Sequence, residues 1–230
     1  MYVINLMGMD PSTLTGFTFF VVNMALLAAA LFFWLERDNV NPKWKTSLTV
    51  SGLVCFIAAV HYFYMRDAGG TDVVAIRYID WLITVPLLMV ELYIVLLAVT
   101  NVSSGVFKRL LGFTTLMLVF GYLGETQVIS STIGFVGGML FWGLALKEIW
   151  SGEAADANAG SKNTAGQYAY VNLKNIVTFG WLIYPAGYAL GYFGGGVDMD
   201  LTNQVYNLAD FVNKILPGVI VWAAAKMDTK

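Results

Sequence analysis

The chain has 230 residues, of which 58% are hydrophobic and only 12% are charged, and its formal net charge is -2. A soluble domain carries about 25% charged residues, so this composition excludes an ordinary water-exposed surface and favours a membrane-embedded chain. The single cysteine, Cys55, lies in an apolar run and excludes both an intramolecular disulfide and a multi-cysteine metal site.

Seven apolar stretches follow one another along the chain, each near the roughly 20 residues that a helix needs to cross a bilayer. They predict spans near 14–36, 44–65, 72–97, 105–124, 128–150, 167–193 and 203–226. Long continuous runs favour helices over a β-barrel, whose strands alternate in hydropathy. The longest polar piece, 151–166, predicts a mobile loop. Residues 1–230 therefore predict one all-α domain, a seven-transmembrane-helix bundle.

The distribution of basic residues predicts the orientation of the chain. With the N-terminus outside, ten basic residues flank the cytoplasmic ends of the spans and one, Arg66, lies on the outer side. The ten are Arg37, Lys43, Lys45, Lys108, Arg109, Lys147, Lys162, Lys174, Lys226 and Lys230. This bias predicts an outer N-terminus and a cytoplasmic C-terminus.

The third span carries ionisable residues, which are costly inside a bilayer and so indicate function. In RYIDWLITVPLLMVELY, Arg77, Asp80, Thr84, Leu88 and Glu91 recur every three or four residues and form one stripe. We expect Arg77 to hold Asp80 ionised, and we expect Glu91 to be desolvated and protonated. The two residues lie about 16 Å apart along the helix axis. Two carboxyls in different protonation states make a proton acceptor and a proton donor. The alternatives are a packing contact for Glu91 and a bond to its own helix backbone for Thr84.

The seventh and second spans add three more ionisable residues. Lys214 lies midway along an apolar helix, and Asp210 precedes it by four residues on the same face. A desolvated lysine is a nucleophile toward aldehydes, although a buried Lys–Asp pair in a transporter core is the alternative. The only histidine, His61, has Asp80 as a candidate partner, and the alternative is a hydrogen-bonded core histidine.

These motifs resemble those of the proteorhodopsins, a family of microbial rhodopsins. The resemblance rests on the third span, on YNLADFVNKIL, and on KWKTSLTVSGLV, HYFYMR and FGWLIYPAGY, and it extends from about Leu14 to Trp222. It implies all-trans retinal, bound covalently to Lys214 as a protonated Schiff base. The function that it implies is a light-driven outward proton pump.

The resemblance also implies roles for the ionisable residues. Asp80 is expected to be counterion and proton acceptor, Asp210 the second counterion and Glu91 the cytoplasmic donor. His61 is expected to interact with the acceptor, and Thr84 completes the Asp–Thr–Glu pattern of outward proton pumps.

A retinal pocket is the next implication of the resemblance. The aromatic residues Trp81, Trp181, Tyr184 and Tyr188 match the pocket of the family, although such residues taken singly are more typical of ordinary packing. Met117, Gly121 and Trp142 are expected at the ring end, and Leu88 indicates green absorption. Pro185 is expected to kink the sixth span.

Three further residues carry expectations of their own. Tyr206 is expected to bond a carboxylate. Pro217, where relatives carry Phe, removes an N–H that would bond the carbonyl of Asn213. Phe135 stands where antenna-binding relatives have Gly, so no carotenoid antenna is expected.

The expected setting is the bacterial inner membrane, with the lipid bilayer and protons as partners and a homo-oligomer, a pentamer or hexamer, as the assembly. No nucleic acid, metal or enzymatic activity is expected, since the sequence has no Gly-rich phosphate motif or metal-ligand cluster. Two rival functions share the buried lysine: a sensory retinal photoreceptor that signals through a partner, and a transporter without pigment.

Overall fold

The computed structural model describes residues 12–68, 72–193 and 199–229, which hold helices and no strand. Seven spans are long and apolar enough to cross a membrane, and they confirm the predicted all-α bundle. The spans cover Leu14–Asn39, Pro42–Arg66, Val73–Val99, Ser104–Glu125, Ser131–Gly160, Thr164–Phe193 and Asp200–Met227. The predicted breaks after Arg66 and after Phe193 fall largely outside the described residues, as does Lys230.

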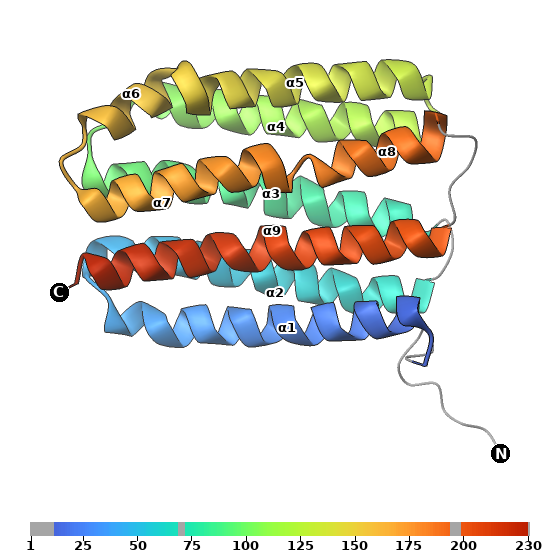
Figure 1. Ribbon diagram of the computed structural model, residues 1–230, viewed down its shortest axis with the longest axis horizontal. Coiled ribbons are helices and arrows are strands. Elements are labelled where there is room, and N and C mark those ends of the chain that lie inside the picture. Colours follow the sequence, from blue (N-terminus) through green and yellow to red (C-terminus); the bar gives the residue numbers. More distant parts are fainter. Residues whose placement is uncertain (1–11, 69–71, 194–198, 230) are drawn as a thin grey trace.

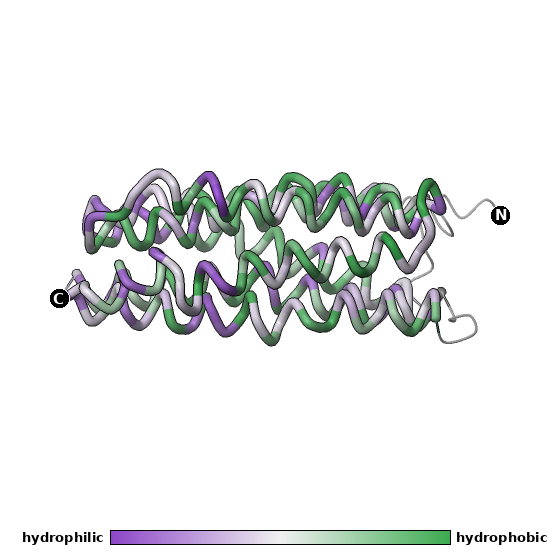
Figure 2. The backbone as a smooth tube through the Cα atoms, turned by 90° about the horizontal axis from the view of Figure 1, so that it is seen from above, coloured by the Kyte–Doolittle hydropathy of each residue, from purple (hydrophilic) through white to green (hydrophobic). Residues whose placement is uncertain are grey.

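The main helices of the first five spans are α1 (Leu14–Glu36), α2 (Lys45–Ala68), α3 (Asp72–Val99), α4 (Ser104–Glu125) and α5 (Ser131–Ser151). Short 3₁₀ turns, Arg37–Asn39 and Pro42–Trp44, join α1 to α2. Thr13, Ser103 and Ser130 cap α1, α4 and α5, because each side chain accepts a hydrogen bond from an amide of the first turn. Hydrophobic residues recur along the length of the bundle (Figure 2).

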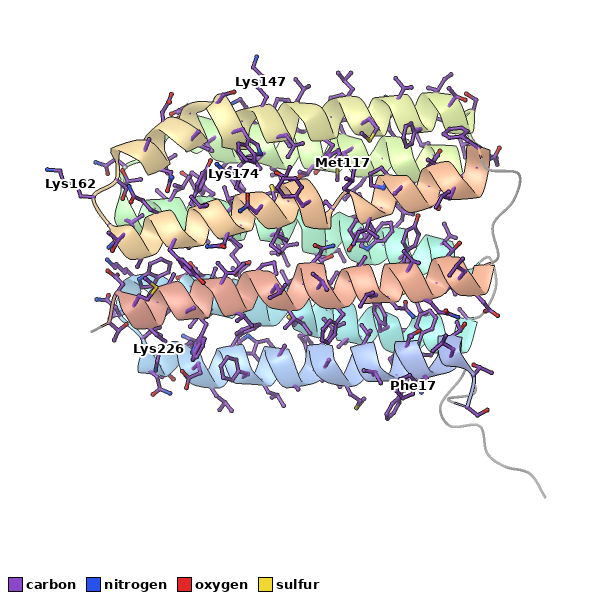
Figure 3. All side chains as sticks on the ribbon, in the orientation of Figure 1. Phe17, Met117, Lys147, Lys162, Lys174 and Lys226 are labelled. Atoms are coloured by element: carbon purple, nitrogen blue, oxygen red, sulfur yellow. The ribbon has the colours of Figure 1, made fainter. Side chains whose placement is uncertain are left out.

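Helix α9 (Met199–Met227) and helix α3 occupy the middle of the bundle. Helix α9 packs on α1, α2, α7 and α8, and α3 packs on α2, α4 and α7. The start of α1 and the end of α9 lie at opposite ends of the bundle (Figure 1). Lys162 and Lys226 lie toward the end at which α9 finishes (Figure 3). Side chains of α3 and α9 meet at the centre, where Lys214 of α9 contacts Asp80 of α3.

Helices α4 and α5 approach closely because glycines meet between them. A Cβ atom on Gly134 would lie 2.6 Å from the Cα of Gly124, and one on Gly137 would lie 2.3 Å from the Phe120 ring. Small residues that let backbones approach are typical of helix packing in membranes. The turn before α5 contains Gln127, whose φ of 60° is in the left-handed region.

The prediction of a mobile loop over 151–166 is wrong. The segment contains α6 (Glu153–Gly160), and α7 (Thr164–Asn175) follows, capped by Asn163. Arg109 of α4 donates to Glu148 of α5 and to Glu153 of α6, each at 2.8 Å. This ion-pair network fixes a segment whose composition predicts only that it is polar.

The sixth span is broken ahead of Pro185. Helix α7 continues into a π-helical segment, Ile176–Gly180, and α8 begins only at Ile183 (Figure 1). The amide of Trp181 donates to the carbonyl of Ile176 at 3.1 Å, five residues back. Proline has no N–H to continue the ladder, and π-segments of this kind often lie at functional sites.

The end of α9 is tied to two neighbouring segments by Asp228. Its carboxylate accepts hydrogen bonds from Trp44 and Asn163, both at 2.8 Å, and pairs with Lys43 at 2.6 Å. Burial favours a raised pKa for Asp228, but these three partners together hold the pKa below its ordinary value.

Candidate functional site

The centre of the bundle holds a buried lysine between two buried carboxylates. The Nζ atom of Lys214 lies 3.0 Å from Oδ2 of Asp210 and also contacts Oδ2 of Asp80. Lys214 is 3% exposed, and both carboxylates are fully buried. Charges in this position are tolerated only when they are paired. Asp80 comes from α3 and the other two from α9, so the pairing of helices predicted from the sequence is present.

Asp210 is surrounded by donors from three helices. Tyr62 of α2 donates to Oδ2 at 2.8 Å, and Tyr184 of α8 and Trp81 of α3 donate to Oδ1 at 2.7 and 3.2 Å. The guanidinium of Arg77 is 3.7 Å from Oδ2. Hydrogen bonds to a carboxylate favour its charged form. Asp210 therefore has three hydrogen-bond donors and a guanidinium beside it, apart from Lys214.

The expectation that Arg77 holds Asp80 ionised is not met by the geometry. The long side chain of Arg77 extends toward α9, where it donates to Asn207 at 2.6 Å and to Asn203 at 3.2 Å. Its ion-pair partner is Asp210. Sequence analysis missed Asn203 and Asn207, although their spacing of four residues places both on the helix face that carries Asp210.

Asp80 has fewer partners than Asp210. Besides Lys214, its carboxylate has His61, whose Nδ1 lies 3.4 Å from Oδ1 and 2.9 Å from the carbonyl of Ile57. Oδ1 has no hydrogen-bond partner among the described residues. The hydroxyl of Thr84 donates to the backbone carbonyl of Asp80 at 2.9 Å, which is the intrahelical bond that we gave as its alternative. Asp80 thus has fewer hydrogen-bond donors around its carboxylate than Asp210.

Glu91 is fully buried on the same side of α3 and farther along the helix. The hydroxyl of Ser51 on α2 contacts its Oε1, and the same hydroxyl donates to the carbonyl of Ser47 at 3.1 Å. Oε2 has no hydrogen-bond partner in the part of the chain that the structure describes. Glu91 is therefore a buried carboxyl with a single polar partner, Ser51, a contact that the sequence did not predict.

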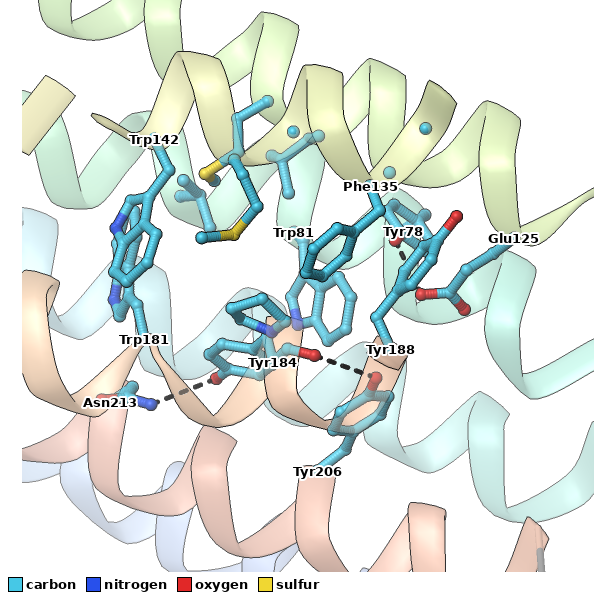
Figure 4. A pocket seen from close by; sticks show the side chains of 18 of the residues that line it. Tyr78, Trp81, Glu125, Phe135, Trp142, Trp181, Tyr184, Tyr188, Tyr206 and Asn213 are labelled. Atoms are coloured by element: carbon cyan, nitrogen blue, oxygen red, sulfur yellow. Dashed lines mark hydrogen bonds between the residues drawn. The ribbon is translucent and has the colours of Figure 1, made fainter. Parts of the chain in front are cut away.

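A cavity of about 830 Å³, which includes the space at its open end, lies beside Lys214 between α3, α4, α5, α8 and α9. All ten residues expected to hold retinal line it: Lys214, Trp81, Leu88, Met117, Gly121, Trp142, Trp181, Tyr184, Pro185 and Tyr188. Trp142 and Trp181 form one end, and Phe135, Tyr188 and Glu125 lie toward the other (Figure 4). The walls are aromatic and apolar, which is typical of a pocket for an elongated apolar ligand.

Several lining residues were not predicted as pocket residues. Tyr78 donates to Glu125 at 2.9 Å, and both line the cavity. Tyr206 also lines it, but its hydroxyl donates to the carbonyl of Tyr184 at 3.3 Å, so the prediction that it bonds a carboxylate is wrong. Asn213, next to Lys214, also lines the cavity and was not predicted. These residues share helix faces with the predicted residues, so helical periodicity could have identified them.

Comparison with known proteins agrees with this geometry. The family model for bacteriorhodopsin-like proteins matches residues 13–227. The green-light absorbing proteorhodopsin of Gamma-proteobacterium EBAC31A08 is 49% identical over 226 residues, covering 96% of this chain and 90% of that protein.

Solved structures give the same answer for the fold. The blue light-absorbing proteorhodopsin from Med12 is 42% identical with a TM-score of 0.83, covering 94% of this chain and 100% of that one. Xanthorhodopsin, described as a light-driven ion pump with dual chromophore, is 25% identical with a TM-score of 0.81 and 96% coverage of both chains. The chain therefore belongs to the bacteriorhodopsin-like family, as a microbial rhodopsin of the proteorhodopsin type.

Proposed function

We propose that this chain is a light-driven outward proton pump that carries all-trans retinal as a protonated Schiff base on Lys214. The observation that carries the proposal is a buried amine that lies between two carboxylates and borders an aromatic cavity. Its relatives include light-absorbing proteorhodopsins and a light-driven ion pump, which supports the same activity.

The residues present fit retinal. The ammonium of Lys214 stands where the protonated imine nitrogen would be, and Asp80 and Asp210 supply the negative charge that this nitrogen needs. The apolar walls suit a polyene, with Trp81 and Trp181 among them. Retinal bound there would supply light absorption and a nitrogen whose hold on its proton changes on isomerisation. Leu88 adds no polar group to the wall, so we propose green absorption.

The unequal surroundings of the two carboxylates support Asp80 as the proton acceptor. Asp210 retains three hydrogen-bond donors and Arg77 when Lys214 is disregarded. Asp80 then retains only His61, at 3.4 Å. An anion with fewer donors takes up a proton more readily, so Asp80 receives the proton and Asp210 remains charged as the second counterion.

Glu91 is proposed as the cytoplasmic donor because it is buried, has one polar contact and lies on the stripe that contains Asp80. His61 is proposed to modulate the acceptor. Arg77 is proposed to act through its ion pair with Asp210, which joins α3 to α9. Thr84 is proposed to fix the backbone at Asp80. Protons then leave on the outer side and enter from the side of Glu91.

The basic residues support an orientation with the N-terminus outside and the C-terminus in the cytoplasm. We propose that residues 1–230 form one domain in the bacterial inner membrane and that the chain assembles as a homo-oligomer, a pentamer or hexamer. A carotenoid antenna is not part of the proposal, because the ring of Phe135 stands at the edge of the cavity against Tyr188, with ring centroids 5.6 Å apart.

The test of the pumping function is illumination of bacterial cells that express the chain and are supplied with retinal in unbuffered medium. We expect the medium to acidify in the light and the change to vanish when a proton uncoupler is added. A coloured chain that cycles over seconds without acidification would instead identify a sensory photoreceptor, and a chain that stays colourless would identify a transporter without pigment.

Replacing Glu91 with glutamine is expected to slow the return of the proton to the site at Lys214 by about a hundredfold, because a positioned proton donor contributes roughly 10²–10⁴-fold. The visible absorption maximum should change little, since Glu91 does not line the retinal cavity. Flash photolysis measures both quantities. Glu153→Gln, at a half-exposed carboxylate of α6, is the matched control and should leave the kinetics unchanged. Equal kinetics for the two variants would remove Glu91 from the mechanism.

A further inference from the structure

The break in the sixth span leaves a backbone carbonyl to be satisfied. In an uninterrupted α-helix the amide of Tyr184 would donate to the carbonyl of Gly180. Here that amide donates to the carbonyl of Trp181 at 3.1 Å, where Pro185 has no N–H to offer. The carbonyl of Gly180 is thus released from the helix ladder inside the bundle, where an unpaired backbone group is costly.

Asn213 of α9 satisfies this carbonyl. Its Nδ2 donates to the carbonyl of Gly180 at 2.9 Å, and the side chain is 1% exposed. The approach requires glycine, because a Cβ atom at position 180 would lie 2.0 Å from Oδ1 of Asn213. The asparagine directly before Lys214 therefore joins the lysine-bearing helix to the break in the sixth span.

The same amide also reaches the counterion through Tyr184. Nδ2 of Asn213 lies 3.4 Å from the Tyr184 hydroxyl, and Figure 4 shows the two side chains pointing toward each other. That hydroxyl in turn donates to Oδ1 of Asp210 at 2.7 Å. An amide has two N–H groups, so one can serve the carbonyl and the other the hydroxyl. The donors run in one direction, from Asn213 through Tyr184 to Asp210.

We infer that Asn213 is a positioning residue that holds the π-segment 176–180 against α9 and orients the Tyr184 hydroxyl toward Asp210. The contacts of Asn213 with the π-segment do not depend on retinal. The consequence for colour rests on the proposed function, because only a retinal-bearing chain reports the charge of Asp210 in its spectrum.

Hydrogen–deuterium exchange of the retinal-free protein in detergent tests the contacts of Asn213 with the π-segment. In Asn213→Ala, backbone amides over 176–184 should exchange roughly tenfold faster, since a buried carbonyl is left without its donor. Asn23→Ala is the matched control: Asn23 also donates from a buried side chain to a carbonyl on a neighbouring helix, that of Ala59, at 2.5 Å. The Asn23→Ala substitution should leave the exchange rates of amides 176–184 unchanged. Equal exchange over 176–184 in the two variants would overturn the inference.

A second substitution keeps the inference testable if Asn213→Ala does not fold. Gly180→Ala places a methyl group against Oδ1 of Asn213 and should give the same faster exchange. In the double variant the methyl group meets no asparagine oxygen, so the combined effect should be smaller than the sum of the two single effects. Strictly additive effects would show that the two residues do not act through each other.

The colour of the retinal-bearing protein tests the path to Asp210. The dependence of the visible absorption maximum on pH should differ from that of the unsubstituted chain in Asn213→Ala but not in Asn23→Ala. Identical pH profiles for all three proteins would remove the link to Asp210. If the unsubstituted chain itself stayed colourless, the proposed function would fail, whereas the exchange experiment would still decide the role of Asn213.

Discussion

Replacing Lys214 with alanine is expected to leave the chain colourless after retinal is added, because no other amine lines the cavity in the described part of the chain. Formation of an imine needs a primary amine at the site of the aldehyde. The measurement is the visible spectrum of the purified protein with and without retinal. A visible band that survives the substitution would place the chromophore elsewhere and would end the proposed mechanism.

The same substitution should also destabilise the retinal-free protein. Without Lys214, Asp80 and Asp210 remain buried and lose the positive charge that lies between them. Removing one partner from a buried ion pair costs about 3–5 kcal/mol. We expect a lower free energy of unfolding, measured by circular dichroism during denaturation in detergent.

Two further variants separate colour from stability. Lys214→Arg keeps a positive charge but cannot form the imine, because the guanidinium stays protonated. It should be colourless and more stable than the alanine variant. Lys226→Ala is the matched control on the same helix: Lys226 pairs with Glu36 at 3.3 Å but is 40% exposed. It should be coloured and nearly as stable as the unsubstituted chain, since exposed pairs contribute about 0–1 kcal/mol.

The parts of the site that follow helical periodicity could be predicted from the sequence. Asp80 and Glu91 share a face of α3 because eleven residues make about three turns. Asp210 and Lys214 share a face of α9 because they are four residues apart. The seven apolar stretches predicted seven helical spans, since only segments with internal hydrogen bonds cross a membrane.

The parts that depend on how two helices are rotated against each other could not be predicted. Arg77 is three residues from Asp80 on α3, but it contacts Asp210, Asn203 and Asn207 of α9. No periodicity within α3 contains that information. The expected partner of Arg77 was Asp80, whereas its ion-pair partner in the structure is Asp210.

Irregular backbone was the other limit. Pro185 predicts a disturbance of the sixth span, but not that the disturbance is a π-segment whose released carbonyl is bound by Asn213. The loop expected over 151–166 failed for a related reason. Its short helix is held by Arg109 on α4, a contact more than 40 residues away in sequence. Both features depend on tertiary partners, which local patterns do not specify.

The two carboxylates beside Lys214 differ in their surroundings, so their removal should have different effects. Asp210 has its own donors from α2, α3 and α8. Asp80 has an oxygen, Oδ1, without a hydrogen-bond partner among the described residues. We therefore propose Asp80 as the proton acceptor and Asp210 as the second counterion.

Asp80→Asn is expected to abolish light-driven acidification by cells while the protein still binds retinal. An amide at position 80 cannot take up the proton, so the outward transfer has no acceptor. The absorption maximum should move to longer wavelength, because one of the two negative charges beside the protonated nitrogen is lost. The measurements are the pH of an unbuffered, illuminated suspension and the visible spectrum. Asp38→Asn, at an exposed aspartate paired with Lys45 at 3.0 Å, is the control and should pump normally. Pumping that persists in Asp80→Asn and stops in Asp210→Asn would reverse the assignment of acceptor and second counterion.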